Sequence, residues 1–179
     1  MIKIFICFFS FLLLSCLSSM EEKESSLISC NGNYNIVSKV DIKKFNLDDS
    51  SKVKKTDEEW RKILSKEQFI VTRQSGTEPP FSGDYWNNKD KGNYYCVCCD
   101  NLLFLSETKF NSGTGWPSFY APAFEDNVKQ VIDNSIGMIR NEVVCNKCDA
   151  HLGHVFEDGP LPSGLRYCIN SISLKFKKE

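Results

Sequence analysis

The sequence predicts a mainly β domain of antiparallel strands that opens with two short helices. Three observations lead to this fold class. Its 179 residues, 41% of them hydrophobic, suit one globular domain with appendages. Two capping-box patterns stand near the start of that domain. Short apolar or aromatic runs then follow one another, separated by Gly, Pro, Asn and Asp.

The first residues, MIKIFICFFSFLLLSC, combine Lys3 with an apolar run over residues 4–14 that is too short to span a bilayer permanently. They predict an export signal over residues 1–19. The segment LLSC resembles a bacterial lipoprotein processing box, in which Cys16 becomes the lipidated first residue. An ordinary cleaved signal and an uncleaved anchor are the alternatives. We expect an exported protein, either periplasmic or a membrane-anchored lipoprotein, with secretion or the secretory pathway as the alternative location.

Residues 20–54 are polar and predict a flexible tether with one short strand at residues 34–40. The capping boxes TDEE, before Trp60, and SKEQ, before Phe69, predict two short helices at the start of a domain over residues 55–179. Strands are predicted at residues 94–97, 102–105, 128–132, 138–144 and 165–176.

Nine cysteines exceed what a paired disulfide framework in one chain can use, because their number is odd. Two Cys-x-x-Cys pairs, Cys96 with Cys99 and Cys145 with Cys148, predict a closed tetrahedral site for a structural Zn²⁺. Two local disulfides or a redox-active pair are the alternatives. Cys98 would make a poorer knuckle than Cys99. We expect the domain to loosen on chelation.

One thiol stands in the strand-like run LRYCINS, at Cys168. Alternate strand residues share a face, so Arg166, Cys168 and Asn170 would lie together. A neighbouring arginine lowers a thiol pKa, which predicts a reactive nucleophile. The alternative is a small buried core thiol.

Both histidines of the chain, His151 and His154, fall in HLGHVFEDGP. On an extended segment His154, Phe156 and Asp158 share a face, so we expect Asp158 to orient the imidazole of a proton donor. A metal ligand and a satisfied core histidine are the alternatives. The loop NSGTGWPSF carries Trp116 and Phe119, which either line a pocket or dock on the core.

In this order, the Cys-x-x-Cys pairs, SGTGWPSF, RNEVVCNKCDAHLGHVFEDGP and GLRYCINS resemble the B type methionine sulfoxide reductases, over about residues 56–176. The resemblance implies two antiparallel sheets in a β-tent-like reductase fold, with zinc far from the chemistry. It implies protein repair under oxidative stress: the R epimer of methionine sulfoxide, in proteins or peptides, is reduced through a sulfenic acid that a thioredoxin-type reductant removes.

The resemblance also implies a role for each site residue. Cys168 would be the nucleophile, and His151 and His154 would lie near the sulfoxide oxygen. Asp158 and Arg166 would give polar support, Asn170 would orient the site, and Trp116 would pack on the substrate methyl, with Phe119 as a second substrate-binding ring. Many members carry a cysteine where this chain has Thr114. We therefore expect the sulfenic acid of Cys168 to be resolved by Cys30, by Cys98 or directly by an external reductant.

Charge limits the partners that the chain can have. A formal net charge of -1 without a basic block excludes a nucleic-acid footprint. No self-association signal stands out, so we expect a monomer. Two other functions fit part of the pattern, namely a zinc-ribbon docking module without catalysis and a thiol peroxidase that needs no methyl pocket at Trp116.

Overall fold

The structure, a computed structural model, describes residues 52–179. The predicted export signal, Cys16, Cys30 and the predicted strand at residues 34–40 lie outside the described residues. Along residues 52–179, no helix combines the length and apolar character needed to cross a bilayer. Of the predicted tether, residues 52–54 are described, and there the backbone N–H of Val53 donates to the carbonyl of Lys147 at 2.8 Å.

The two helices form where the capping boxes predict them. They are α1 (Asp57–Ile63) and α2 (Lys66–Arg73), with Thr56 and Ser65 as N-caps. In each cap the side chain accepts from the third helical N–H while that residue's side chain accepts from the cap, which satisfies two otherwise free donors. Helices this short are marginal alone, so the buried Trp60 and Phe69 hold them against the core.

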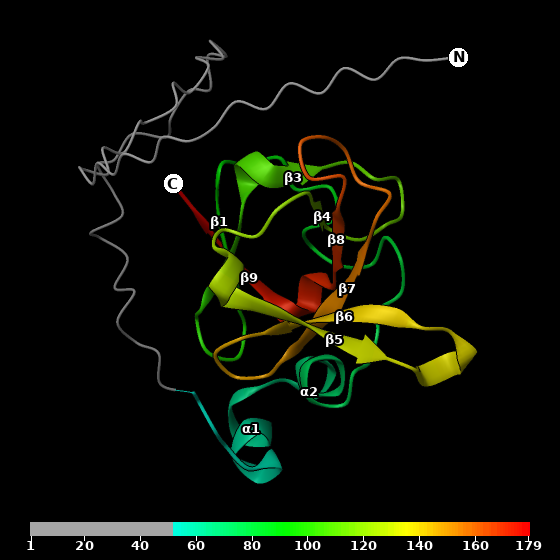
Figure 1. The fold of residues 1–179 in the computed structure, drawn as a ribbon. Coiled ribbons are helices and arrows are strands. Elements are labelled where there is room, and N and C mark those ends of the chain that lie inside the picture. The colour runs from blue at the N-terminus through cyan, green and yellow to red at the C-terminus, as the bar shows by residue number, and fades with distance from the viewer. Residues whose placement is uncertain (1–51) are drawn as a thin grey trace, which may run out of the picture. The chain divides into compact units, whose positions relative to one another are not determined.

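The strands form two antiparallel sheets, as expected (Figure 1). The three-stranded sheet has the order β2-β1-β9, and the six-stranded sheet has the order β3-β4-β8-β7-β6-β5. The bounds are β1 (Gly92–Cys96), β2 (Leu102–Leu105), β3 (Lys109–Phe110), β4 (Ser118–Phe119), β5 (Val128–Asp133), β6 (Arg140–Cys145), β7 (His151–Phe156), β8 (Arg166–Ile169) and β9 (Leu174–Lys178).

Residues 165–176 do not form the single strand that the sequence predicts. They form β8, a 3-10 turn (Ser171–Ser173) and the start of β9, and the two strands belong to different sheets. The buried carboxylate of Glu78 makes the break, because it accepts from the backbone N–H groups of Ser171 (2.6 Å) and Ile172 (2.9 Å). Strand propensity cannot reveal a turn that depends on a residue about ninety positions earlier.

Aromatic rings join the two sheets. Phe119 of β4 stacks on Phe104 of β2, with ring centroids 4.4 Å apart, and meets Tyr94 of β1 edge to face at 5.1 Å. Tyr167 of β8 lies 5.8 Å from Phe104. Figure 1 shows the two helices together on one side of this body, while the β5–β6 hairpin extends away from it.

Candidate active site and metal centre

A single cross-strand row of the six-stranded sheet contains the candidate nucleophile. Residues paired across an antiparallel ladder share a face. The row runs through Val131, Glu142, His154, Cys168, Ser118 and Phe110. The structure therefore brings Cys168 and His154 together, and it adds Glu142, which the sequence analysis did not identify.

Cys168 is half-buried on β8, and its pairing with β7 depends on a glycine. A Cβ atom on Gly153 would lie 2.0 Å from the carbonyl oxygen of Cys168, so no other residue allows this approach of the two strands. Burial raises the pKa of the Cys168 thiol, and the cation of Arg166 and the hydroxyl of Thr114 offset this only in part. Arg166 acts in the expected direction, but the expectation of a net lowered pKa was wrong, because desolvation disfavours the charged thiolate.

Asp158 does not orient a histidine, contrary to the sequence-based expectation. It binds Arg166 in a bidentate ion pair, with Oδ1 to Nε at 2.8 Å and Oδ2 to Nη2 at 2.9 Å. The guanidinium also lies over the ring of Phe156, 4.4 Å from its centroid. Asp158 follows the end of β7, so the strand alternation that would place it beside His154 no longer applies there. The ion pair with Asp158 holds Arg166 in place, and the charge of Arg166 interacts with Cys168.

Each histidine has a carboxylate partner from the β5–β6 hairpin instead. Nδ1 of His151 lies 2.6 Å from Oε1 of Glu142, and Nε2 of His154 lies 2.8 Å from Oδ2 of Asp133. The same Asp133 oxygen accepts from Nη2 of Arg140 at 2.7 Å. Residue spacing gives no signal for these pairs, because they depend on the register between β5, β6 and β7.

The carboxylates fix which nitrogen of each imidazole carries a proton, since an ionised carboxylate can only accept a hydrogen bond. Hydrogen bonds from Ser135 and His154 hold the pKa of Asp133 well below its usual range, so it accepts from Nε2–H of His154. Burial lowers the pKa of His151, which Glu142 offsets only in part. Nε2 of His151 is buried without a hydrogen-bond partner, and the two rings lie 5.5 Å apart. Neutral His151 thus presents an unprotonated nitrogen beside His154.

The Trp116 loop is anchored to the body from two sides. The indole Nε1 donates to the carbonyl of Glu78 at 3.1 Å, and the backbone N–H of Phe81 donates to the carbonyl of Gly115 at 2.8 Å. Gly115 has a φ of 89°, and a Cβ there would lie 2.8 Å from the Phe81 nitrogen, so this contact requires glycine. The indole is half-buried, which leaves part of its surface open.

Asn170 acts on the same loop rather than on the thiol. Its buried side chain accepts from the backbone N–H of Glu78 at 3.1 Å and donates to the carbonyl of Leu152 at 3.0 Å. Asn170 therefore ties β7 to the residue that holds Trp116. Sequence analysis gave Asn170 an orienting role but missed Glu78, through which that role passes.

Thr114 and Phe119 have different surroundings. Oγ1 of Thr114 lies 4.0 Å from the Cys168 sulfur and continues into a hydroxyl chain through Ser112 to Ser118, with both oxygen separations 2.8 Å. Phe119 is fully buried against Phe104, so it belongs to the core and not to the substrate pocket. Phe119 comes directly after Ser118 in β4, which pairs with β8. Because alternate strand residues point to opposite faces, the ring of Phe119 lies on the face opposite Ser118 and Cys168.

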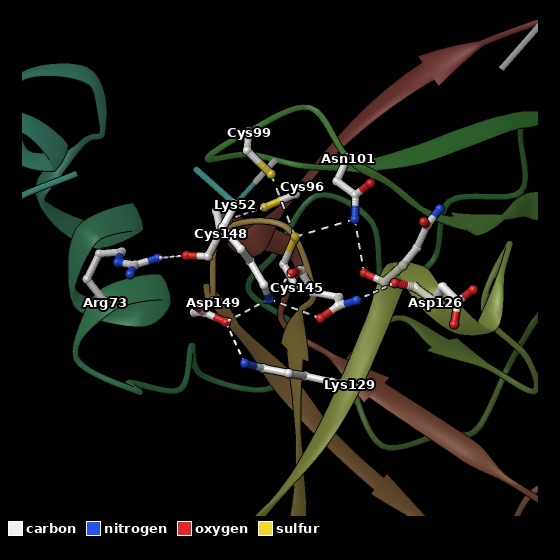
Figure 2. Close-up of polar contacts among 12 residues, drawn as sticks. Lys52, Arg73, Cys96, Cys99, Asn101, Asp126, Lys129, Cys145, Cys148 and Asp149 are labelled. Atoms are coloured by element: carbon white, nitrogen blue, oxygen red, sulfur yellow. Dashed lines mark hydrogen bonds and ion pairs between the residues drawn. The ribbon is translucent and has the colours of Figure 1, made fainter. Parts of the chain in front are cut away.

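Four cysteines form a second centre, the clasp, made of Cys96, Cys99, Cys145 and Cys148 (Figure 2). Their sulfur atoms all lie within 4.8 Å of one another, with Cys96 to Cys148 at 3.7 Å and Cys99 to Cys145 at 3.6 Å. Four sulfurs bound about 2.3 Å from one tetrahedral ion would be about 3.8 Å apart. Disulfide-bonded sulfurs would be about 2.05 Å apart, so the alternative of two disulfides does not fit. The donor set fits a closed metal site with no open position.

The two halves of the clasp are near copies of one turn. In each, the residue after the second cysteine has a left-handed backbone, with φ of 54° at Asp100 and 57° at Asp149. Its N–H donates to the carbonyl of the first cysteine at 2.9 Å in both turns. Around them, Nδ2 of Asn101 lies 3.5 Å from the Cys145 sulfur, and Arg73 of α2 donates to the carbonyl of Cys148 at 2.9 Å (Figure 2).

Comparison with known proteins agrees with this geometry. A family model described as the SelR domain matches residues 64–178. A peptide methionine sulfoxide reductase MsrB of Herminiimonas arsenicoxydans is 60% identical over 127 residues, which cover 71% of this chain and 93% of that protein. The chloroplastic peptide methionine sulfoxide reductase B1 of rice, Oryza sativa subsp. japonica, is 65% identical over 124 residues, 69% of this chain and 58% of that protein. An MsrB of Hahella chejuensis is 58% identical over 125 residues, 70% of this chain and 90% of that protein.

Proposed function

The chain belongs to the B type methionine sulfoxide reductase family, an oxidoreductase family, and we propose that it reduces the R epimer of methionine sulfoxide, in proteins or peptides, through Cys168. One observation carries the proposal: the only half-buried thiol outside the clasp region, among residues 52–179, pairs across the ladder with His154 and lies beside Thr114. The relatives that the chain matches at 58% to 65% identity are named peptide methionine sulfoxide reductases.

The first half-reaction balances with the thiol protonated. The Cys168 sulfur attacks the sulfoxide sulfur and forms a sulfur–sulfur bond with it. The oxygen then moves to the Cys168 sulfur, where a new sulfur–oxygen bond gives the sulfenic acid, while the sulfur–oxygen and sulfur–sulfur bonds of the substrate sulfur break and release methionine. The thiol proton ends on that oxygen, so methionine sulfoxide and thiol become methionine and sulfenic acid with no net proton exchanged. The raised pKa of Cys168 is therefore compatible with the reaction, because the resting thiol brings the proton that the oxygen needs.

His151 and His154 are suited to move that proton. A sulfoxide becomes electrophilic only when its oxygen is hydrogen-bonded or protonated. His154 lies across the ladder from Cys168, and the unpartnered Nε2 of neutral His151 can accept a proton and return it. Glu142 and Asp133 act as positioning residues, because each holds one imidazole nitrogen and leaves the other free.

Selection of one epimer requires three fixed contacts around the sulfoxide sulfur. The proposed contacts come from three separate elements, which are the thiol on β8, the histidines on β7 and the indole of Trp116 on its loop. When the direction of thiol attack, the oxygen and the methyl group of the substrate are all fixed, the other epimer cannot make the three contacts at the same time. The half-buried indole, held by Glu78, supports the role of Trp116 as the methyl contact.

Racemic N-acetyl-methionine sulfoxide, offered with dithiothreitol, tests this proposal. We expect half of the racemate to disappear, only as the R epimer, and Cys168→Ser to abolish the consumption. If neither epimer is consumed, a zinc-ribbon docking module without catalysis would explain the fold better. Consumption of hydrogen peroxide in place of either epimer would favour the thiol peroxidase.

We propose Zn²⁺ as the resident ion of the clasp. Four thiolates with tetrahedral spacing are the donor set of structural zinc sites, and Asn101 supports one of them from outside. The ion would contribute folding free energy, and no reaction step passes through it.

The second half-reaction needs a reductant, for which we propose a thioredoxin-type protein acting directly on the sulfenic acid of Cys168. Thr114 stands where many family members carry a resolving cysteine. Cys98 is half-buried against the clasp thiols of Cys96 and Cys148, which does not favour its release toward Cys168. Cys30 is the remaining internal candidate.

We propose that the protein works outside the cytoplasm, as a periplasmic or lipid-anchored enzyme. The apolar run that ends at LLSC supports this proposal. Labelling with a radioactive fatty acid tests the anchor, and we expect label on the unaltered chain and none on Cys16→Ala. Label on neither chain would leave an ordinary export signal as the explanation.

A further inference from the structure

The turn from Pro79 to Ser82 exposes a phenylalanine in a backbone conformation that favours glycine. The backbone N–H of Ser82 donates to the carbonyl of Pro79 at 3.4 Å and closes the turn, in which Phe81 is the third residue and has a φ of 63°. A positive φ at the third position of a turn favours Gly or Asn, and a bulky side chain there costs free energy. The ring of Phe81 is 55% exposed, so burial in the core does not compensate for this strain. A strained residue of this kind indicates a functional constraint.

This turn contacts the loop that borders Cys168. The backbone N–H of Phe81 donates to the carbonyl of Gly115 at 2.8 Å, and a Cβ atom at Gly115 would lie 2.9 Å from Cδ2 of the phenyl ring. Gly115 directly follows Thr114, whose hydroxyl lies 4.0 Å from the Cys168 sulfur. It directly precedes Trp116, the proposed contact of the substrate methyl group. The phenyl ring therefore lies against the loop segment that carries both side chains.

A second aromatic ring extends this surface. Trp86 meets the ring of Phe81 edge to face, with ring centroids 5.2 Å apart. Trp86 also lines a cleft together with Phe110. Phe110 stands in the cross-strand row of Cys168, two strand spacings or about 10 Å away from it. An extended polypeptide covers that distance in about three residues, so the aromatic surface lies within reach of the neighbours of a methionine sulfoxide bound at Cys168.

We propose that Phe81 is a specificity-determining residue, whose ring packs on a large apolar side chain near methionine sulfoxide in an oxidised polypeptide. This inference rests on the proposed function. A polypeptide whose sulfoxide reaches Cys168 brings its neighbouring residues onto the surface around the sulfur, which includes the loop that Phe81 contacts. The exposed ring gains free energy when it covers an aliphatic or aromatic side chain. The turn fixes the ring in place before the substrate binds, which lowers the entropy cost of that contact.

Two peptides and one small substrate test this contact. One peptide carries leucine at the three positions on each side of methionine sulfoxide, the other carries glycine there, and both have the same lysine pairs at their ends. N-acetyl-methionine sulfoxide reports the reaction site alone. Phe81→Asn removes the ring but keeps a residue that tolerates the left-handed backbone, and Phe81→Tyr keeps the ring. The matched control is Ile63→Asn on α1, where the isoleucine is 57% exposed.

We expect the ratio of kcat/KM for the leucine peptide to kcat/KM for N-acetyl-methionine sulfoxide to fall about fivefold in Phe81→Asn, since one apolar contact is lost. Phe81→Tyr and Ile63→Asn should keep the ratio of the unaltered protein, and the glycine peptide should show little change. An unchanged ratio in Phe81→Asn would overturn the contact alone. Failure of the unaltered protein to reduce N-acetyl-methionine sulfoxide would instead overturn the proposed function.

The reductant is the main competing partner of the ring. Each rate is therefore measured with dithiothreitol and with a thioredoxin. We expect the loss in Phe81→Asn to depend on the peptide and not on the reductant. A loss that occurs only with thioredoxin, and equally for all three substrates, would assign the ring to the reductant and overturn the proposal.

Discussion

The clasp and the reaction site hold their sulfur atoms in opposite ways. Each pair of clasp thiols comes from one five-residue turn, and the two turns share a left-handed Asp and the same hydrogen bond. Cys168 instead depends on partners spread from residue 114 to residue 166. A local turn can present ligands with little help, whereas the reaction site exists only when six strands are in register.

The electrostatic surroundings differ as well. In the clasp, four thiols lie close enough for one cation to bind all of them as thiolates. At Cys168, a single thiol is buried and its nearby cation is already paired with Asp158, so its pKa is raised. One centre is therefore suited to ionised sulfur held by a metal, and the other to a protonated thiol that ionises during the reaction.

The largest expected effect is the loss of stability when the clasp is broken. Cys148→Ser, or a strong chelator, should release the metal and remove stability on the order of 10 kcal/mol, since metal binding and folding are coupled. Circular dichroism during denaturant unfolding, with elemental analysis, measures both changes. Cys98→Ser is the matched control in the neighbouring turn and should keep metal and fold. A native unfolding curve for metal-free Cys148→Ser would contradict a structural clasp.

A smaller effect is expected when the positioning carboxylate of Glu142 is neutralised, and it concerns the rate and not the stability of the fold. Glu142→Gln keeps the shape of the side chain but removes the charge that orients His151, so kcat should fall about a hundredfold while the unfolding curve stays in place. Its pH profile should change with it, which a merely structural role would not cause. Glu157→Gln, at an exposed carboxylate after β7, is the control and should keep full activity. Equal rates for both variants would remove Glu142 from the mechanism.

The smallest effect concerns the ionisation of Cys168. Because burial raises the pKa of Cys168, its alkylation by iodoacetamide should accelerate at a higher pH than the alkylation of an exposed thiol does. Arg166→Gln should shift this acceleration to a still higher pH, because it removes the charge that lowers the pKa. Because the pKa of Cys168 is higher in the folded than in the unfolded protein, folding favours the protonated thiol. The contribution of this thiol to the free energy of unfolding is present below the unfolded-state pKa and is lost as the pH rises through the folded-state pKa. Faster alkylation of Arg166→Gln at neutral pH would contradict the assigned effect of the guanidinium.

Local signals in the sequence predicted the parts of the molecule that are built locally. The capping boxes, most strands and the clasp ligands, with Cys99 in preference to Cys98, appear as expected. What failed depends on distant partners. Glu78 breaks the last predicted strand, Asp133 replaces Asp158 beside His154, and β3 and β4 are too short to leave a periodic pattern.

Two corrections have the same physical origin. Phe119 lies in the core because its two-residue strand turns alternate side chains to opposite faces, and the sequence did not reveal that strand. The pKa of Cys168 is raised because burial outweighs the charge of Arg166, and burial follows from the packing of whole sheets. Residue type and spacing predicted that Arg166 acts on Cys168, but not that burial of the thiol outweighs its charge.

One turnover without reductant tests the central claim most directly, namely that Cys168 takes the sulfoxide oxygen and no thiol of residues 52–179 is placed to resolve it. Peptide mapping by mass spectrometry after dimedone trapping should find the adduct on Cys168 and one methionine formed per protein. In Thr114→Cys, where Oγ1 of the native residue is 4.0 Å from the sulfur, the same experiment should give an internal disulfide instead. Methionine formed while Cys168 of the unaltered protein stays unmodified would contradict the account.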